Sequence, residues 1–338
     1  MHEQNTSNYL NTGSKRQIIS YRNSATITKW LNLDLGATLA YTINNNSGVT
    51  LSNIQSWAPQ VMLKDEQGNL TNIPTGFNYL PAMSSLPLES FPYPFFYNPV
   101  EEIENRSLTN KSLDTRITAA LTFRLIKGLT LESRMQYEDN NLFNRSLYNE
   151  NTSLVRQTVN VASTWDRATN DVTLNLPLGG ILDQSRTQTK ALIVRNQLNY
   201  SYSEGKHDFY ALAGVELSDR VYQSFSNPRA YGYSDEKLTV GTFPNGPGGS
   251  NVKLIYNWLG RSQTFSYNNS FSYNTRRFYA AYANATYSYD SKYTLTGSIR
   301  SDASNFITDD PKYRYAPFWS IGAGWNIFRE DFMQNIEF

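Results

Sequence analysis

Residues 279–300 read YAAYANATYSYDSKYTLTGSIR, and this stretch decides the fold class. Its side chains alternate with a period of two, which is the period of an extended strand with one apolar face. A short polar segment at 290–292 interrupts the alternation. The stretch therefore predicts two antiparallel strands joined by a tight turn, with these apolar positions: Tyr279, Ala281, Ala283, Ala285, Tyr287, Tyr289, then Tyr293, Leu295, Gly297 and Ile299.

The same alternation recurs along the rest of the chain. It predicts about nine strands, and residues 332–338 look like the beginning of a tenth. Several of these strands keep the pattern for ten residues or more. The predicted strands lie near 18–27, 31–41, 113–125, 129–137, 192–202, 209–217, 279–289, 293–299 and 319–327.

Short and long connections alternate between these strands. In an up-and-down meander this places all short turns on one rim and all long loops on the other, as in outer-membrane barrels. The short turns are expected at 29–30, 127–128, 204–206, 290–292 and 329–331, and the long loops at 43–111, 141–186, 224–271 and 304–316. The sequence therefore predicts an all-β fold, an antiparallel up-and-down transmembrane β-barrel with long extracellular loops.

Strand length and side-chain chemistry favour this membrane barrel over a soluble sheet. A tilted strand needs about 9 to 11 residues to cross a bilayer, whereas strands of soluble proteins usually have about five or six. Aromatic residues gather near the short turns, where they would form a membrane-interface girdle. The polar face carries large charged groups suited to a wet interior, and the candidates to face the lumen or a plug are Arg116, Arg124, Arg134 and Arg300.

Composition excludes several other classes. The 338 residues include 30 basic and 29 acidic side chains, so a surface for nucleic acid is not expected. No apolar run approaches the roughly 20 residues of a membrane-spanning helix. With no cysteine and two histidines, no enzymatic site, metal site or cofactor is expected. The pair Glu101-Glu102 is interpreted as solvated loop charge.

An incomplete barrel is the expected domain organisation. Every strand inside a bilayer needs partners on both sides, so the sheet has to close, and nine strands cannot close an antiparallel meander. We therefore expect residues 1–14 to form a flexible N-terminal segment and 15–338 to form part of a larger barrel. No signal peptide and no plug domain is recognised.

Two segments carry family motifs, YDSKYTLTGSIRSDASNF at 289–306 and KYRYAPFWSIGAGWNIFREDFM at 312–333. They resemble the SusC/RagA-type TonB-dependent outer-membrane transporters of the Bacteroidetes, and YNPVEEIEN at 97–105 is similar to that family's Asn-Pro stretch before a strand. Ala303 and Trp319 depart from the family pattern. The matching positions are Tyr289, Asp290, Lys292, Tyr293, Ser298, Arg300, Asp302, Ser304, Phe306, Trp325, Glu330 and Phe332.

The resemblance implies a portion of a 22-stranded barrel that imports a large nutrient, an oligosaccharide or a peptide, across the outer membrane. It implies outer-membrane lipid around the wall, a SusD-like surface lipoprotein over the loops, and TonB acting only through the plug region. Aromatic loop residues are candidates to contact the substrate, although packing of the loops on one another or against the lipoprotein partner is the stronger interpretation. These candidates are Phe91, Tyr93, Phe95, Phe96, Tyr97, Tyr231, Tyr233 and Trp258.

Two other functions remain open at this point. A self-contained outer-membrane barrel or adhesin would use its long loops to bind a surface partner. A soluble carbohydrate-binding β-protein would instead seal its apolar rows between two layers.

Overall fold

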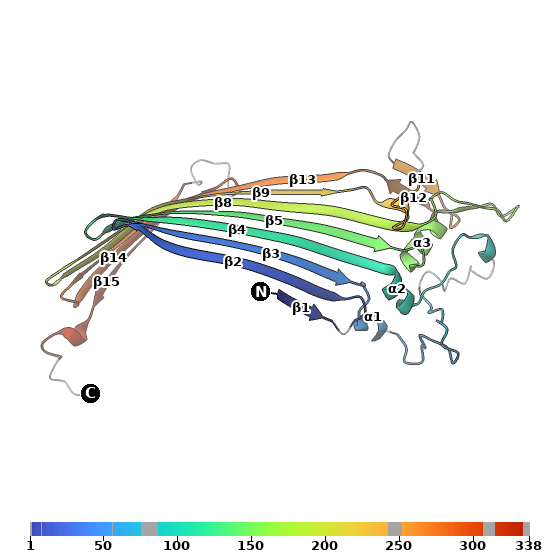
Figure 1. Cartoon of the computed structure of the whole chain (residues 1–338), viewed down its shortest axis with the longest axis horizontal. Helices are drawn as coiled ribbons and strands as arrows, with labels where there is room; N and C mark the ends of the chain where they lie inside the picture. The colour runs from blue at the N-terminus through green and yellow to red at the C-terminus, as the bar shows by residue number, and fades with distance from the viewer. Residues whose placement is uncertain are drawn as a thin grey trace.

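The computed structural model describes residues 2–7, 9–55, 57–75, 87–242, 252–306 and 315–333. Ten strands form one curved antiparallel meander in the order β1-β2-β3-β4-β5-β8-β9-β13-β14-β15, with the short strand β10 added to β8 (Figure 1). Their bounds are β1 His2–Thr6, β2 Gly13–Thr28, β3 Leu31–Asn46, β4 Arg106–Ile126, β5 Leu129–Tyr148, β8 Gly180–Glu204, β9 His207–Ser226, β10 Ala230–Tyr233, β13 Ser270–Tyr289, β14 Tyr293–Ser304 and β15 Pro317–Trp325.

The nine predicted strands and the four short turns at 29–30, 127–128, 204–206 and 290–292 are confirmed, and the sheet of the described residues is not closed. In the described residues β1 pairs only with β2, and β15 only with β14. Residues 2–6 form β1, although they belong to the segment expected to be flexible. Of the expected tenth strand, residues 334–338 lie outside the described residues, and the chain after β15 forms a 3-10 turn, η4 (Ile327–Arg329).

The strands extend further toward the long loops than the sequence pattern predicts. β4 has 21 residues, β5 has 20, β8 has 25 and β9 has 20. A bilayer needs about 9 to 11 residues per tilted strand. About half of each of these strands therefore stands beyond the hydrocarbon layer.

One face of the sheet, called the outer face here, carries a continuous apolar band. Cross-strand partners place Leu39, Ile117, Leu217 and Ile299 on this face, and each side chain is between 40% and 55% exposed. In the described residues no second layer covers the band, which excludes the two-layer soluble alternative. The band covers 129–137 in β5, 192–202 in β8, 209–217 in β9 and 279–289 in β13, broken on this face by Ser133 and Asn196.

The outer face becomes polar where the band ends. Asp139, Lys190, Asp219 and Arg277 follow it on the same face, one on each of four neighbouring strands. A band of nine to eleven residues per strand matches the thickness that tilted strands must cross. The opposite face, called the inner face, holds the charged rows of the predicted lumen.

The motif residues of the short turns bind successive hairpins to one another. Asp290 donates its N–H to the Lys206 carbonyl oxygen at 2.6 Å and accepts from Lys206 Nζ at 2.9 Å. Asp290 and Ser291 both have positive φ, as the type I′ hairpin turn requires. Lys292 continues the chain of contacts by pairing with Glu330 at 3.0 Å.

Glu330 is the hub of this rim. Its carboxylate accepts hydrogen bonds from Tyr293 Oη at 2.5 Å and from Trp325 Nε1 at 3.0 Å. These two hydrogen bonds and the Lys292 ammonium lower the pKa of Glu330 to about 2. The motif residues Asp290, Lys292 and Glu330 thus have a structural role, because their contacts join neighbouring turns at one end of the sheet.

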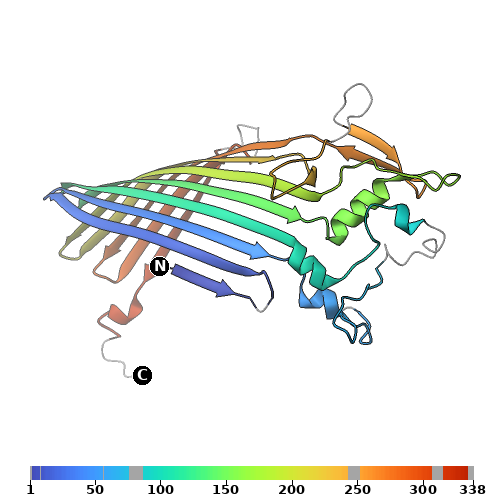
Figure 2. The ribbon, with the colours of Figure 1, turned by 45° about the vertical axis from the view of Figure 1, so that its right-hand side comes forward.

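At the other end, the long connections fold together into what we call the loop layer, the described parts of 47–105, 149–179 and 227–269 (Figure 2). None of the helices in the described residues is long and apolar enough to cross a membrane. The elements of the loop layer are α1 Leu51–Gln55, η2 Leu88–Ser90, α2 Pro99–Asn105, α3 Ser153–Ala162, β6 Thr164–Trp165, β7 Val172–Thr173, β10, β11 Val252–Tyr256 and β12 Ser262–Ser266.

Candidate functional site: the loop layer and the inner face

Three of the candidate aromatics pack on one another rather than toward solvent. Phe91, Phe95 and Trp258 have ring centroids 5.2 to 6.3 Å apart, in edge-to-face arrangements. Trp258 also donates from Nε1 to the Asn160 carbonyl oxygen at 2.9 Å. All three rings are less than a tenth exposed, so in this structure they join the first and third loops to α3 and offer little surface to a ligand.

A second buried cluster surrounds Tyr231, which packs edge-to-face on Phe265 at 5.9 Å. Tyr93 packs against this cluster, and its hydroxyl accepts the Gly179 N–H at 2.9 Å. Burial raises the pKa of the Tyr93 hydroxyl. The buried members of the cluster are Val155, Val159, Ala162, Leu176, Ile181, Tyr231, Ile255 and Phe265.

The remaining candidate aromatics, Phe96, Tyr97 and Tyr233, are partly exposed, and each contacts a different residue. Phe96 lies beneath the Arg156 guanidinium, with Cζ 5.7 Å from the ring centroid. Tyr97 packs edge-to-face on Trp57 at 6.1 Å. Tyr233 donates its hydroxyl to Asp235 at 3.0 Å. The eight candidates therefore do not form one ligand-binding face in this structure.

Asn98, the Asn of the Asn-Pro stretch, is a structural residue of the loop layer. It is fully buried and caps α2, where its Oδ1 accepts the Val100 N–H at 2.9 Å. Its Nδ2 donates to the carbonyl oxygens of Leu63 and Thr71, both at 2.8 Å. An Asn cap followed by Pro at the first helical position is a preferred helix start, and this explains the Asn-Pro stretch.

The interpretation of Glu101-Glu102 as solvated charge is wrong, because both carboxylates are paired. Glu101 receives a bidentate contact from Arg156, at 2.9 Å for each of two hydrogen bonds. Glu102 is buried, accepts the Ser153 N–H at the start of α3 and lies 3.6 Å from Arg106. Burial raises the pKa of Glu102. The acidic pair thus fixes α2 against α3.

The four candidate arginines lie on the inner face, as the alternation predicts. Arg116 pairs with Glu138 at 2.9 Å, Arg134 with Glu132 at 3.0 Å, and Arg300 with Asp302 at 2.8 Å. Arg124 has no acidic partner among the described residues. Each of the three paired arginines leaves at least half of its side chain exposed, so these groups remain available to a polar molecule inside the barrel.

Comparison with known proteins identifies this architecture. No protein-family model matches the chain. The chain is 27% identical over 165 residues to TonB-dependent receptor P26 of Formosa agariphila. It superposes on the RagAB peptide transporter with a TM-score of 0.62 at 16% identity, and on the RagAB peptide importer in the open-open state with 0.65 at 15% identity. The resemblance to the SusC/RagA-type transporters is confirmed.

The structural matches cover nearly all of this chain, but every match covers a minority of the relative's own length. The superpositions include 95% and 99% of this chain, and 31% and 32% of the RagAB chains. The curated match covers 48% of this chain and 15% of the receptor. The chain therefore has the fold of one portion of a SusC/RagA-type barrel, and the relatives are transporters and receptors rather than enzymes.

Proposed function

We propose that this chain forms part of the wall and the outward loop layer of a TonB-dependent importer of large nutrients in the outer membrane. The observation that carries the proposal is the single meander with an apolar outer face, a charged inner face and a packed loop layer at one end. The fold shared with RagAB supports it. TonB would act through a plug region of the longer protein.

The proposed cargo is an oligosaccharide or a peptide. Both classes are polar, and the inner face offers exposed guanidinium groups beside carboxylates at Arg116, Arg134 and Arg300. Guanidinium groups bind carboxylates and carbonyl or hydroxyl oxygens through several donors. The RagAB structures are named for peptide transport, which makes peptide the first class to test.

A SusD-like lipoprotein is the proposed partner of the loop layer. Several apolar side chains of this layer are exposed, and a protein partner would cover them. These side chains are Met62, Leu88, Leu238, Val240, Leu254 and Tyr256.

An uptake assay tests the import proposal. Cells that lack the gene and cells complemented with it receive fluorescent oligosaccharides or fluorescent peptides too large for general porins. We expect the complemented cells alone to accumulate one of the two classes, and a protonophore to abolish that accumulation. Equal accumulation with and without the gene would refute import, and accumulation that survives the protonophore would refute TonB coupling.

A further inference from the structure

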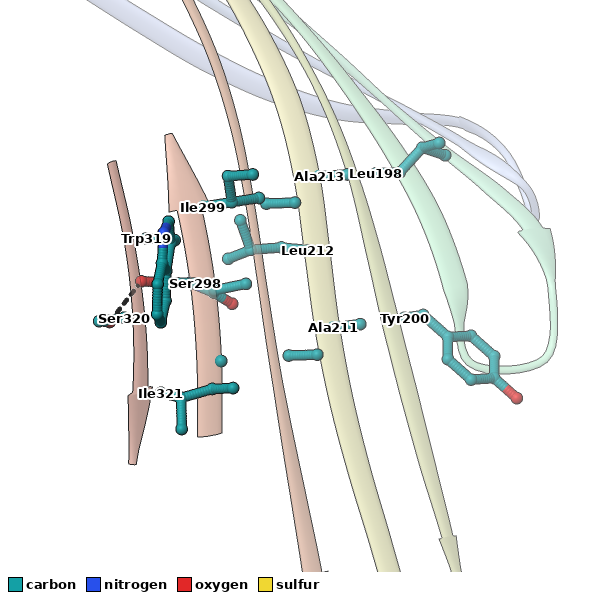
Figure 3. A pocket seen from close by; sticks show the side chains of 14 residues that line it. Leu198, Tyr200, Ala211, Leu212, Ala213, Ser298, Ile299, Trp319, Ser320 and Ile321 are labelled. Carbon is teal, nitrogen blue, oxygen red and sulfur yellow. Dashed lines mark hydrogen bonds between the residues drawn. The ribbon is translucent and has the colours of Figure 1, made fainter. Parts of the chain in front are cut away.

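A furrow runs along the outer face, inside the apolar band (Figure 3). Its floor consists of small side chains on β9, β13 and β14, namely Ala211, Ala213, Ala283, Ala285 and Gly297. Larger side chains form its margins: Leu198 and Tyr200 on one side, Ile299, Trp319 and Ile321 on the other. The hollow has a volume of about 560 Å³.

The furrow continues toward the long-loop end of the sheet. A second hollow of about 500 Å³ shares Leu198, Ala213, Ala283 and Ile299 with the first. It extends to Val215 and Ala281. Strand register explains its continuity, because Ala213 lies opposite Ala283 and Val215 lies opposite Ala281.

A hydrocarbon chain is the occupant that fits this surface. The furrow lies in the band that faces the hydrocarbon layer, and nearly all of its lining is apolar. Water in the furrow would find almost no hydrogen-bond partners there, and a buried water needs two to four. An empty furrow would lose dispersion contacts along its whole length.

Two cations lie on the same face beyond the upper end of the furrow. Arg277 is four residues beyond Ala281 in β13. Lys190 lies on β8, and β9 runs between these two strands. Lys190 is exposed and has no acidic partner among the described residues. Arg277 is exposed and lies 3.4 Å from Asp219. Asp139, opposite Lys190, accepts hydrogen bonds from Gln188.

These cations lie at the height of lipid headgroups. Arg277 is 12 residues from Tyr289 at the short-turn end of β13, and Lys190 is 14 residues from Glu204 at that end of β8. With a rise of about 3.3 Å per residue and a strand tilt of about 40°, they lie roughly 30 to 35 Å from the turns. The hydrocarbon layer is about 30 Å thick, so both side chains reach the outer interface.

We propose that the furrow, Lys190 and Arg277 form a binding site for one phosphate-bearing lipid of the external leaflet. An acyl chain occupies the furrow over Ala213 and Ala283, and the lipid phosphate lies between the two cations.

Lipid retention tests this site with a matched control. The complete barrel protein that contains this chain is inserted into phosphatidylcholine vesicles with a minor fraction of phosphatidylglycerol, extracted in mild detergent and analysed by native mass spectrometry. We expect one retained phosphatidylglycerol per chain. The double variant Lys190→Gln, Arg277→Gln is expected to retain it about thirtyfold less, since each of the two cations near a membrane contributes about 1 kcal/mol to anionic-lipid binding.

The control variant is Arg220→Gln with Arg276→Gln. These two residues lie opposite one another, next to Asp219 and Arg277 in sequence, on the inner face. Their replacement removes the same charge and should leave retention unchanged. The variant Ala283→Phe, which fills the furrow while keeping both cations, should also lose the lipid.

Three results would overturn the proposal. Equal loss in the inner-face control would show that only net charge matters. Equal retention of phosphatidylcholine would remove the role of the cations. Displacement of the lipid by inorganic phosphate alone would identify a free-anion site instead. Retention of the sheet signal in circular dichroism separates each of these results from misfolding.

Discussion

The loop layer and the wall of the sheet differ in what surrounds their side chains. In the loop layer Ile73, Val155 and Val159 are at most 1% exposed, and a paired Arg156 is buried with them. In the wall, large apolar side chains such as Leu39 and Ile299 keep 40% or more of their surface free. The loop layer therefore carries its own core, whereas the wall depends on lipid and on neighbouring strands for burial.

The largest expected effect distinguishes two tryptophans. Trp258→Ala removes a buried ring of the loop layer and is expected to destabilise that layer by about 3 to 5 kcal/mol. Trp319→Ala removes an outer-face ring that is 73% exposed and should change loop stability little. Hydrogen exchange of α3 amides in detergent measures both. Equal protection of α3 in the two variants would contradict the division into two regions.

The next effect concerns the paired charges between α2 and α3. Arg156→Gln leaves Glu101 without its bidentate partner, and breaking such a buried pair typically costs about 3 kcal/mol or more. Limited proteolysis within residues 99–162 should become faster. Arg300→Gln is the wall control, because its pair is half exposed. If both variants are cleaved like the wild type, the acidic pair does not fix the helices.

A smaller effect is expected within the wall. A Cβ at Gly214 would lie 2.6 Å from Tyr282, whose ring covers this glycine on the inner face. The Tyr282 hydroxyl donates to Gln197 Oε1 at 2.8 Å. Gly214→Ala should displace the ring and cost about 1 to 3 kcal/mol. The midpoint of thermal unfolding in detergent measures the change. Gly205→Ala meets nothing within 4 Å but has a positive φ, so it reports backbone strain alone.

The smallest effect is a pH response of opposite sign in the two regions. Glu330 at the turn rim has its pKa lowered from 4.5 to about 2, so its contribution to stability is present above 4.5 and is lost as the pH falls toward 2. Burial raises the pKa of Glu102 above 4.5 in the folded state. Protonation of Glu102 as the pH falls through this raised pKa therefore stabilises the loop layer.

Amide exchange at the two sites between pH 6 and pH 2 separates these responses. The turn near Lys292 should lose protection only at the acid end, and Glu330→Gln should remove that transition. Protection of the first turn of α3, which Glu102 holds through Ser153, should not fall over the same range unless global unfolding intervenes. A loss at α3 that precedes the loss at the turn would contradict the assigned signs.

Sequence patterns predicted the wall well because its alternation is local. Within the bilayer one face must be apolar, so the alternation in residues 279–299 is enough to predict two strands and the turn between them. Above the bilayer both faces are wet, and the first part of β4, Arg106 to Ser112, no longer alternates. Backbone pairing alone extends such strands, and it also forms β1 from the polar sequence HEQNT.

The loop layer was beyond the reach of such patterns. Phe91 and Trp258 touch although they are far apart in the chain, and Trp258 contacts α3 from a third loop. Contacts between distant loops leave no periodic signal. The composition of the 91–97 segment predicted aromatic packing or binding, and only the folded chain shows which rings are covered.

The length of the strands has a consequence for anything that approaches the cell from outside. β4, β5, β8 and β9 run as paired strands for 20 or more residues, and about half of that length stands in water. An antibody, a phage or a protease would contact the loop layer and these paired strands before it contacts lipid. Accessible epitopes and cleavage sites should therefore cluster in the loop layer, well above the lipid surface.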